Sequence, residues 1–146
     1  MNVNDIEIVL IEDNPNDAEL AVDALTSKNL ANRIKILKDG EEALDFFFGN
    51  DSEGGSKIVV KPKLILLDLK LPKVSGLEVL QKLKSSKETK DIPVVVLTSS
   101  REHTDLITSY DYGVNSYIVK PVDFNQFMNA ISEVGLYWML LNEPPK

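Results

Sequence analysis

The sequence predicts an α/β fold in which five parallel strands form one sheet and helices cover both of its faces. Short apolar runs rich in β-branched residues alternate with stretches of helical period, a pattern typical of repeated βα units around a parallel sheet. The run from Leu64 to Leu67 has no polar residue, as expected of a central strand that is covered on both faces. We therefore expect a doubly wound (βα)5 arrangement.

The first unit begins with a strand at residues 6–11. Asn14 can cap the helix that follows, and Pro15 suits its first turn because that position needs no backbone N–H. The apolar residues of this helix recur at helical spacing and predict one buried stripe. Its members are Ala18, Ala21, Val22 and Leu25.

The second unit begins with a strand at residues 33–37. Asp39 and Gly40 are expected to form a turn, and a short helix follows at residues 41–48. Its inward residues are Leu44, Phe47 and Phe48. Residues 49–62 are rich in Gly and Ser and predict a surface loop with a small extended piece inside it.

The last three units repeat the pattern, with strands expected at residues 64–67, 94–97 and 116–119. Helices are expected after Gly76, before Gly113 and after Asp123, which can cap the last helix. Their inward residues are Leu77, Leu80, Leu83, Leu106, Ile107, Tyr110, Phe124, Phe127, Met128, Ile131 and Val134. The lysines at positions 82, 84, 87 and 90 are expected on a solvated face.

The composition is typical of a soluble globular domain. The chain has 146 residues, of which 43% are hydrophobic and 27% charged, and it contains no Cys, which excludes a disulfide framework and a thiolate metal site. No signal peptide is recognisable, and no segment reaches the roughly 18 to 20 apolar residues that span a bilayer. The net charge of −7 disfavours nucleic acid and anionic membranes as partners. We expect one cytoplasmic domain over residues 1–146.

Polar residues of one chemical set follow four of the predicted strands. Glu12 and Asp13 end the first, Asp68 the third, Thr98 the fourth and Lys120 the fifth. Each alone could be a helix cap, a structural hydroxyl or a surface charge, but the carboxyl ends of parallel strands meet at one edge of a sheet. Carboxylates suit Mg²⁺, and a hydroxyl and an ammonium suit phosphoryl oxygens. Together they predict Mg²⁺-dependent phosphoryl transfer to one of the carboxylates.

Four segments of the chain resemble the signature blocks of the receiver domain of two-component response regulators. They read IVLIEDNPND, LILLDLKLPKVSG, VVVLTSS and GVNSYIVKPVD, and the resemblance covers about residues 6–134. It implies the flavodoxin-like receiver fold, with Asp68 accepting a phosphoryl group from the phosphohistidine of a separate sensor histidine kinase. It also implies that Mg²⁺ is bound directly by Asp13, through water by Glu12, and by the backbone carbonyl of Lys70.

The same resemblance assigns the remaining positions. Thr98 and Lys120 match the hydroxyl and lysine of the family, and Pro121 matches its cis peptide bond. Tyr117 matches the aromatic residue of the family's switch, whose ring turns into the space that Thr98 vacates when it moves toward phosphorylated Asp68. The alternative is that Tyr117 is an ordinary core residue packed inward.

The C-terminal residues 135–146 depart from the receiver pattern. Five apolar residues follow one another there, namely Tyr137, Trp138, Met139, Leu140 and Leu141. An extended last helix could not bury all of them against one domain, so we expect a homodimer or a docked partner, with folding back onto the same domain as the alternative. This tail and the loop at 49–62 resemble small stand-alone regulators of bacterial phytochrome-type kinases, which implies such a kinase as the donor.

Other functions fit the residues less well. Glu12 and Asp13 would repel the phosphate of a flavin carrier, and Lys70 stands where a haloacid-dehalogenase-like phosphatase needs a second Asp. No phosphate-cradling Gly-rich motif is present, and the residues after 135 are too few for a DNA-binding output domain. We therefore expect a signalling phosphoacceptor, rather than an enzyme acting on other substrates, whose output passes to a downstream protein or phosphotransfer domain. A degenerate receiver that acts only by protein binding is the alternative.

Overall fold

A five-stranded parallel sheet lies at the centre of the fold. The computed structural model describes residues 6–26, 33–49, 62–98, 108, 111–114 and 116–133. The strands are β1 (Ile8–Ile11), β2 (Ile34–Leu37), β3 (Leu64–Asp68), β4 (Val94–Thr98) and β5 (Ser116–Val119). They lie in the order β2-β1-β3-β4-β5, and every neighbouring pair is parallel. The predicted sheet is confirmed, with strand ends that differ from the predicted ones by at most two residues.

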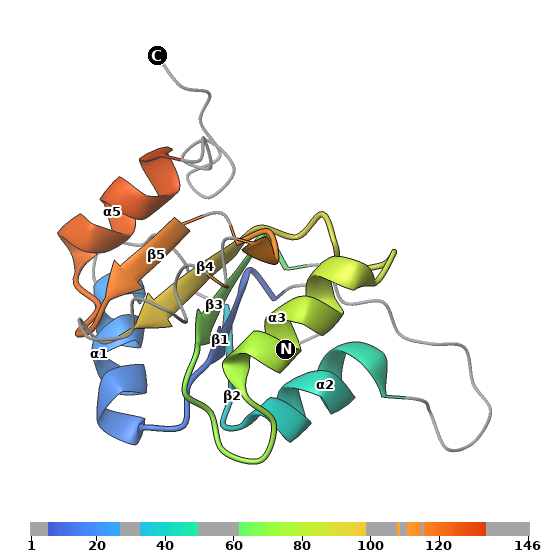
Figure 1. Ribbon diagram of the computed structural model, residues 1–146. Helices are drawn as coiled ribbons and strands as arrows, with labels where there is room; N and C mark the ends of the chain where they lie inside the picture. The colour runs from blue at the N-terminus through green and yellow to red at the C-terminus, as the bar shows by residue number, and fades with distance from the viewer. Residues whose placement is uncertain are drawn as a thin grey trace.

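Helices cover both faces of this sheet. Helices α1 (Pro15–Thr26) and α5 (Phe124–Glu133) lie on one face, and α2 (Gly40–Phe48) and α3 (Gly76–Ser85) lie on the other (Figure 1). Alternate residues of β1 pack into different cores, because successive side chains of a strand point to opposite faces: Ile8 and Leu10 pack with α1 and α5, and Val9 and Ile11 with α2 and α3. The helix predicted around Leu106, Ile107 and Tyr110 lies outside the described residues.

The burial of each element follows its place in the sheet. All residues of β1, β3 and β4 are buried, whereas the edge strand β2 exposes two of its four residues.

The buried stripes of the helices differ from the predicted ones in detail. Ala24 is buried, whereas Val22, which was predicted to be buried, is only partly buried against the core. The other predicted inward residues that are only partly buried are Leu44, Phe48, Leu77, Phe124 and Met128. Ile131 and Val134 lie outside the described side chains. In the described part of the chain, no helix is long and apolar enough to cross a bilayer.

The turn predicted at Asp39 and Gly40 is instead the start of α2. Asp39 is the N-cap, and the backbone N–H of Glu42 donates to its Oδ1 at 2.7 Å, which holds the pKa of the Asp39 carboxyl below its usual range. Gly40 is already helical and touches the loop before α3. A Cβ at this position would lie 2.0 Å from the carbonyl oxygen of Val74, so the approach of these two segments requires glycine.

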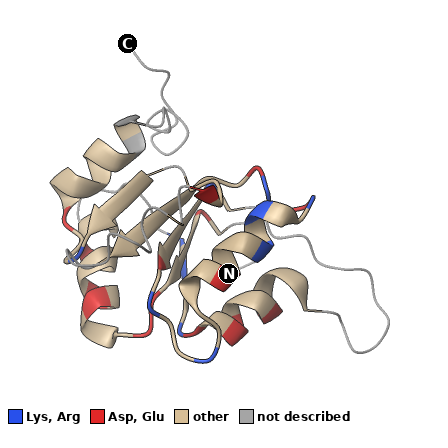
Figure 2. Ribbon diagram, in the orientation of Figure 1, with Lys and Arg blue, Asp and Glu red and all other residues tan. Residues whose placement is uncertain are grey.

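Lys84 is not the solvated lysine that its sequence context predicted. Its ammonium donates to the carbonyl oxygens of Ile92 at 2.8 Å and Lys90 at 3.2 Å, and burial lowers its pKa. It therefore ties the end of α3 to the segment that leads into β4, whereas Lys82, Lys87 and Lys90 are exposed as predicted. Lys82 and Lys84 are the basic residues in the last turn of α3, where positive charge stabilises a helix, and Figure 2 shows blue at this end of the helix.

Candidate phosphoacceptor and metal site

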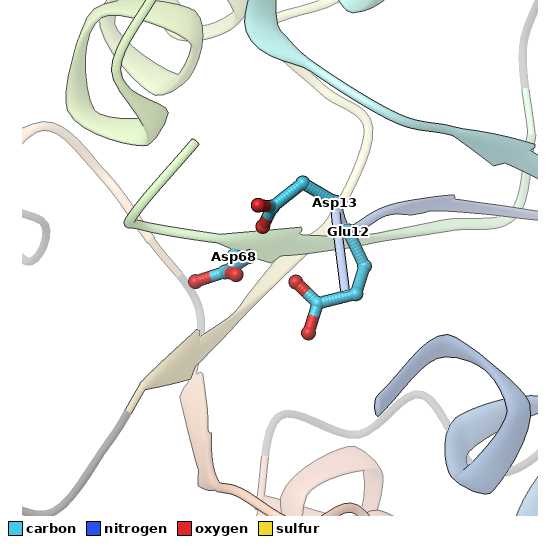
Figure 3. Close-up of side chains that lie close together, drawn as sticks. All are labelled: Glu12, Asp13 and Asp68. Carbon is cyan, nitrogen blue, oxygen red and sulfur yellow. The ribbon is translucent and has the colours of Figure 1, made fainter. Parts of the chain in front are cut away.

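Three carboxylates meet at the carboxyl ends of β1 and β3. These strands are neighbours with Ile11 paired to Leu67, so the residue after each pair, Glu12 and Asp68, lies at the same level. Oxygen atoms of Glu12, Asp13 and Asp68 lie within 4.8 Å of one another, and Figure 3 shows the three side chains gathered at the strand ends. Glu12 and Asp68 are buried and Asp13 is exposed, so the cluster opens to solvent on the Asp13 side.

Lys120 reaches this cluster from the end of β5. Its Nζ donates to Asp68 Oδ2 at 2.8 Å and to Asp17 Oδ2 at 3.2 Å, and it forms an ion pair with Glu12 Oε1. The backbone N–H of Lys120 donates to the carbonyl oxygen of Thr98 at 2.9 Å, which fixes the lysine beside the end of β4. Thr98 itself, the last residue of β4, is buried. The structure thus brings together the residues predicted from four strand ends.

The electrostatics of the cluster follow from its burial. Burial raises the pKa of the Glu12 carboxyl far above its usual range, the neighbouring Asp68 raises it further, and Lys120 opposes both. Burial alone would lower the pKa of the Lys120 ammonium, but Asp68 and Glu12 raise it above its ordinary value. Among the described residues, the Lys120 ammonium is the positive charge that contacts Glu12 and Asp68 and opposes the effect of their burial.

The donor set fits a hard divalent cation. Both carboxylate oxygens of Glu12 are buried. Oε1 forms the ion pair with the Lys120 ammonium, whereas Oε2 has no such partner among the described residues, and burying a carboxylate oxygen without a partner is costly. Three carboxylates with an exposed side match the needs of Mg²⁺, which prefers oxygen ligands and retains several waters. A cation bound there would also relieve the repulsion between the carboxylates.

The backbone around Asp68 fixes its carboxylate. The N–H of Lys70 donates to Asp68 Oδ1 at 3.0 Å, and the N–H of Gly76 donates to the carbonyl oxygen of Leu69 at 2.9 Å. A Cβ on Gly76 would lie 2.3 Å from the carbonyl oxygen of Asp68, so α3 can begin this close to β3 only with glycine. The metal-binding role predicted for the Lys70 carbonyl stays a prediction.

Of the remaining predicted residues, the structure describes Tyr117 and Pro121. Tyr117 on β5 is 42% exposed, so the alternative of an inward-packed core tyrosine is wrong. Its ring borders a surface cavity of about 230 Å³ between β5 and α5. The peptide bond between Lys120 and Pro121 is cis. Tyr137, Trp138 and Leu141 lie outside the described residues.

The sequence analysis did not identify Asp17 as part of this site. Asp17 lies in the first turn of α1, four residues after Asp13, and contacts Lys120. An acidic residue in the first turn of a helix is common because it stabilises the helix by itself, so the position of Asp17 in the sequence did not indicate the site. Its contact depends on Lys120, which comes from β5 to the start of α1.

Comparison with known proteins identifies the family. The profile of the response regulator receiver domain matches residues 8–132. The chain belongs to this family. It is a receiver domain of two-component signalling, and its sheet and helices are those of the flavodoxin-like receiver fold. Receiver domains as a family accept phosphoryl groups from histidine kinases and bind divalent metal ions at an acidic pocket.

The similar proteins include regulators linked to phytochromes. The chain is 52% identical to the bacteriophytochrome response regulator AtBRR, whose structure superposes with a TM-score of 0.77 over 94% of this chain and 98% of that one. It is 36% identical to response regulator Rcp1 of Synechocystis, over 90% of this chain and 88% of Rcp1, and an Mn²⁺-bound form of Rcp1 has been solved. It is also 41% identical to the probable methanogenesis regulatory protein FilR2 of Methanothrix harundinacea, over 94% of this chain and 86% of FilR2.

Proposed function

We propose that residues 1–146 act as a single-domain response regulator in which Asp68 accepts a phosphoryl group from the phosphohistidine of a sensor histidine kinase. The observation that supports this most directly is the position of Asp68. Its buried carboxylate lies within the acidic cluster, 2.8 Å from the Lys120 ammonium and fixed by the N–H of Lys70. Phosphoryl transfer needs this combination of positioning and charge neutralisation.

In the proposed reaction, a carboxylate oxygen of Asp68 attacks phosphorus, the P–N bond of the donor breaks, and the imidazole leaves with a proton. Glu12, Asp13, Asp68 and the backbone carbonyl of Lys70 would hold Mg²⁺, which neutralises charge on the phosphoryl oxygens when it is bound. Lys120 and the Thr98 hydroxyl bind the phosphoryl oxygens from the β5 and β4 side. Water later hydrolyses the acyl phosphate, so the receiver catalyses only its own phosphorylation and dephosphorylation.

The proposed output is a change of surface around β5. Thr98 moves toward the phosphoryl group, and the Tyr117 ring, which is exposed here, turns inward toward the space left behind. The surface formed by the helix predicted before β5, β5 itself and α5 then signals by protein contact or by phosphorelay. The net charge of −7 argues against nucleic acid as the direct target.

We further propose a phytochrome-type kinase as the phosphoryl donor and the cytoplasm as the compartment. The 52% identity to AtBRR, a bacteriophytochrome response regulator, supports this choice of partner. The Mn²⁺-bound form of Rcp1 supports a divalent cation at the equivalent acidic cluster.

The C-terminal apolar run at Tyr137, Trp138 and Leu141 is proposed to form a homodimer interface. Sedimentation of the wild type should give a dimer mass and Trp138→Asp a monomer mass, because a buried charge opposes association. A monomer mass for both proteins would remove the dimer from the proposal.

The first test of function is the intact mass of the protein after incubation with acetyl phosphate, with Mg²⁺ or with a chelator. We expect a gain of one phosphoryl group only with Mg²⁺. Borohydride reduction of the product should then yield homoserine at position 68, because it cleaves an acyl phosphate. In the same samples, the NMR signals of the Tyr117 ring should shift only with phosphoryl gain. If no phosphoryl group is gained under any condition, the chain is a degenerate receiver that acts by binding alone.

A further inference from the structure

The Lys120 ammonium has a third acidic neighbour, Asp17, outside the predicted metal cluster. Its Oδ2 lies 3.2 Å from Lys120 Nζ. The side chain of Asp17 is 32% exposed, whereas those of Asp68 and Glu12 are 5% and 0% exposed. Asp17 is therefore the neighbour on the solvent side, and it is not one of the three carboxylates close enough to share a cation.

The first turn of α1 fixes the position of Asp17. The side chain of Asn14 caps the helix, since its Oδ1 accepts hydrogen bonds from the N–H groups of Asn16 at 2.9 Å and Asp17 at 3.0 Å. The next residue, Ala18, is buried in the core between the sheet, α1 and α5. A carboxylate on a capped and packed turn is a rigid acceptor for a long and flexible lysine side chain.

We propose that Asp17 is a positioning residue that holds Lys120 in place while its other partners change. An ammonium has three N–H bonds, and three carboxylates surround this one. In the reaction proposed above, on which this inference rests, Asp68 becomes an acyl phosphate and Glu12 helps to hold the cation. Asp17 takes part in neither change, so its contact with the Lys120 ammonium persists throughout the reaction.

This role predicts that Asp17 acts on the reaction through Lys120. Asp17→Asn keeps the size of the side chain and removes the charge that fixes the ammonium. We expect the rate of phosphoryl gain from acetyl phosphate, at saturating Mg²⁺, to fall about fivefold, because small displacements of a reacting partner slow a positioned reaction. The exposure of Asp17 keeps the effect moderate, since solvent screens the pair.

The matched control is Asp23→Asn, which makes the same change at an exposed position of the same helix, about 9 Å further along its axis. It should change the rate less than about twofold, since a distant surface charge is screened. Asp17→Asn is also made in a Lys120→Met background. If Asp17 acts through Lys120, its substitution there should change the residual rate by less than about 1.5-fold. The same fivefold fall in both backgrounds would overturn the proposal.

A second measurement keeps this test separate from that of the proposed function. In protein labelled with ¹⁵N-lysine, the ammonium signal of Lys120 is identified by its loss in Lys120→Met, and its proton exchange with water is measured without phosphodonor. Asp17→Asn should speed exchange several-fold relative to both the wild type and Asp23→Asn. Equal exchange in all three proteins would contradict the anchoring role even if the wild type is phosphorylated. Faster exchange with no phosphorylation of the wild type would instead reject the proposed function alone.

Discussion

Asp68→Asn should take up no phosphoryl group from acetyl phosphate or from a phosphorylated kinase. The amide has nearly the shape of the carboxylate and can still accept the hydrogen bond from the N–H of Lys70, which is 3.0 Å from Asp68 Oδ1 in the wild type. It lacks the negative oxygen that forms the bond to phosphorus. The expected result is thus loss of chemistry with the fold retained, measured by intact mass and circular dichroism.

The controls for this prediction address the neighbouring carboxylates. Asp13 belongs to the same cluster and could become an alternative acceptor when Asp68 is absent, so Asp13→Asn combined with Asp68→Asn is measured as well. Asp45→Asn makes the same substitution at an exposed position of α2 and should accept the phosphoryl group as the wild type does. Phosphoryl gain by Asp68→Asn equal to that of the wild type would show that the acceptor is elsewhere.

The sequence was sufficient to predict the sheet because its strands are short and buried. The runs that form β1, β3 and β4 contain almost only apolar residues, and a polar residue marks the end of each. Since all strands of the sheet are parallel, these ends had to meet at one edge. This made Glu12, Asp68, Thr98 and Lys120 predictable as one set without knowledge of any side-chain contact.

Features that depend on contacts between loops could not be predicted in this way. Gly40 fits against Val74, and Gly76 against Asp68, because two backbones approach closely, but a glycine in sequence indicates equally well a turn. Lys84 was expected in solvent because its neighbours in sequence are polar, yet its partners Lys90 and Ile92 lie in the following loop. Asp17 was missed for the same reason, since its partner Lys120 is 103 residues away in sequence.

Lys120→Met should lower the rate of phosphoryl gain by about 100-fold or more, the usual effect of removing one charged donor from a transition state. Methionine has a similar unbranched stem, so it can fill the space of the lysine without the charge. The measurement is the initial rate with acetyl phosphate at saturating Mg²⁺. Lys87→Met, at an exposed position, is the matched control and should keep the wild-type rate.

The same substitution should change metal binding and stability in opposite directions. The ammonium contacts Glu12 and Asp68, two of the carboxylates that a cation would share, so it competes with Mg²⁺ for them. Without it, Mg²⁺ affinity measured by calorimetry should rise about tenfold, whereas the metal-free protein should lose about 3 kcal/mol of unfolding free energy, the usual cost of leaving buried charge unpaired. Added Mg²⁺ should restore most of that loss, because the cation replaces the missing positive charge. A slower reaction with unchanged Mg²⁺ affinity would mean that the Lys120 ammonium binds the phosphoryl oxygens but does not compete with Mg²⁺ for the carboxylates.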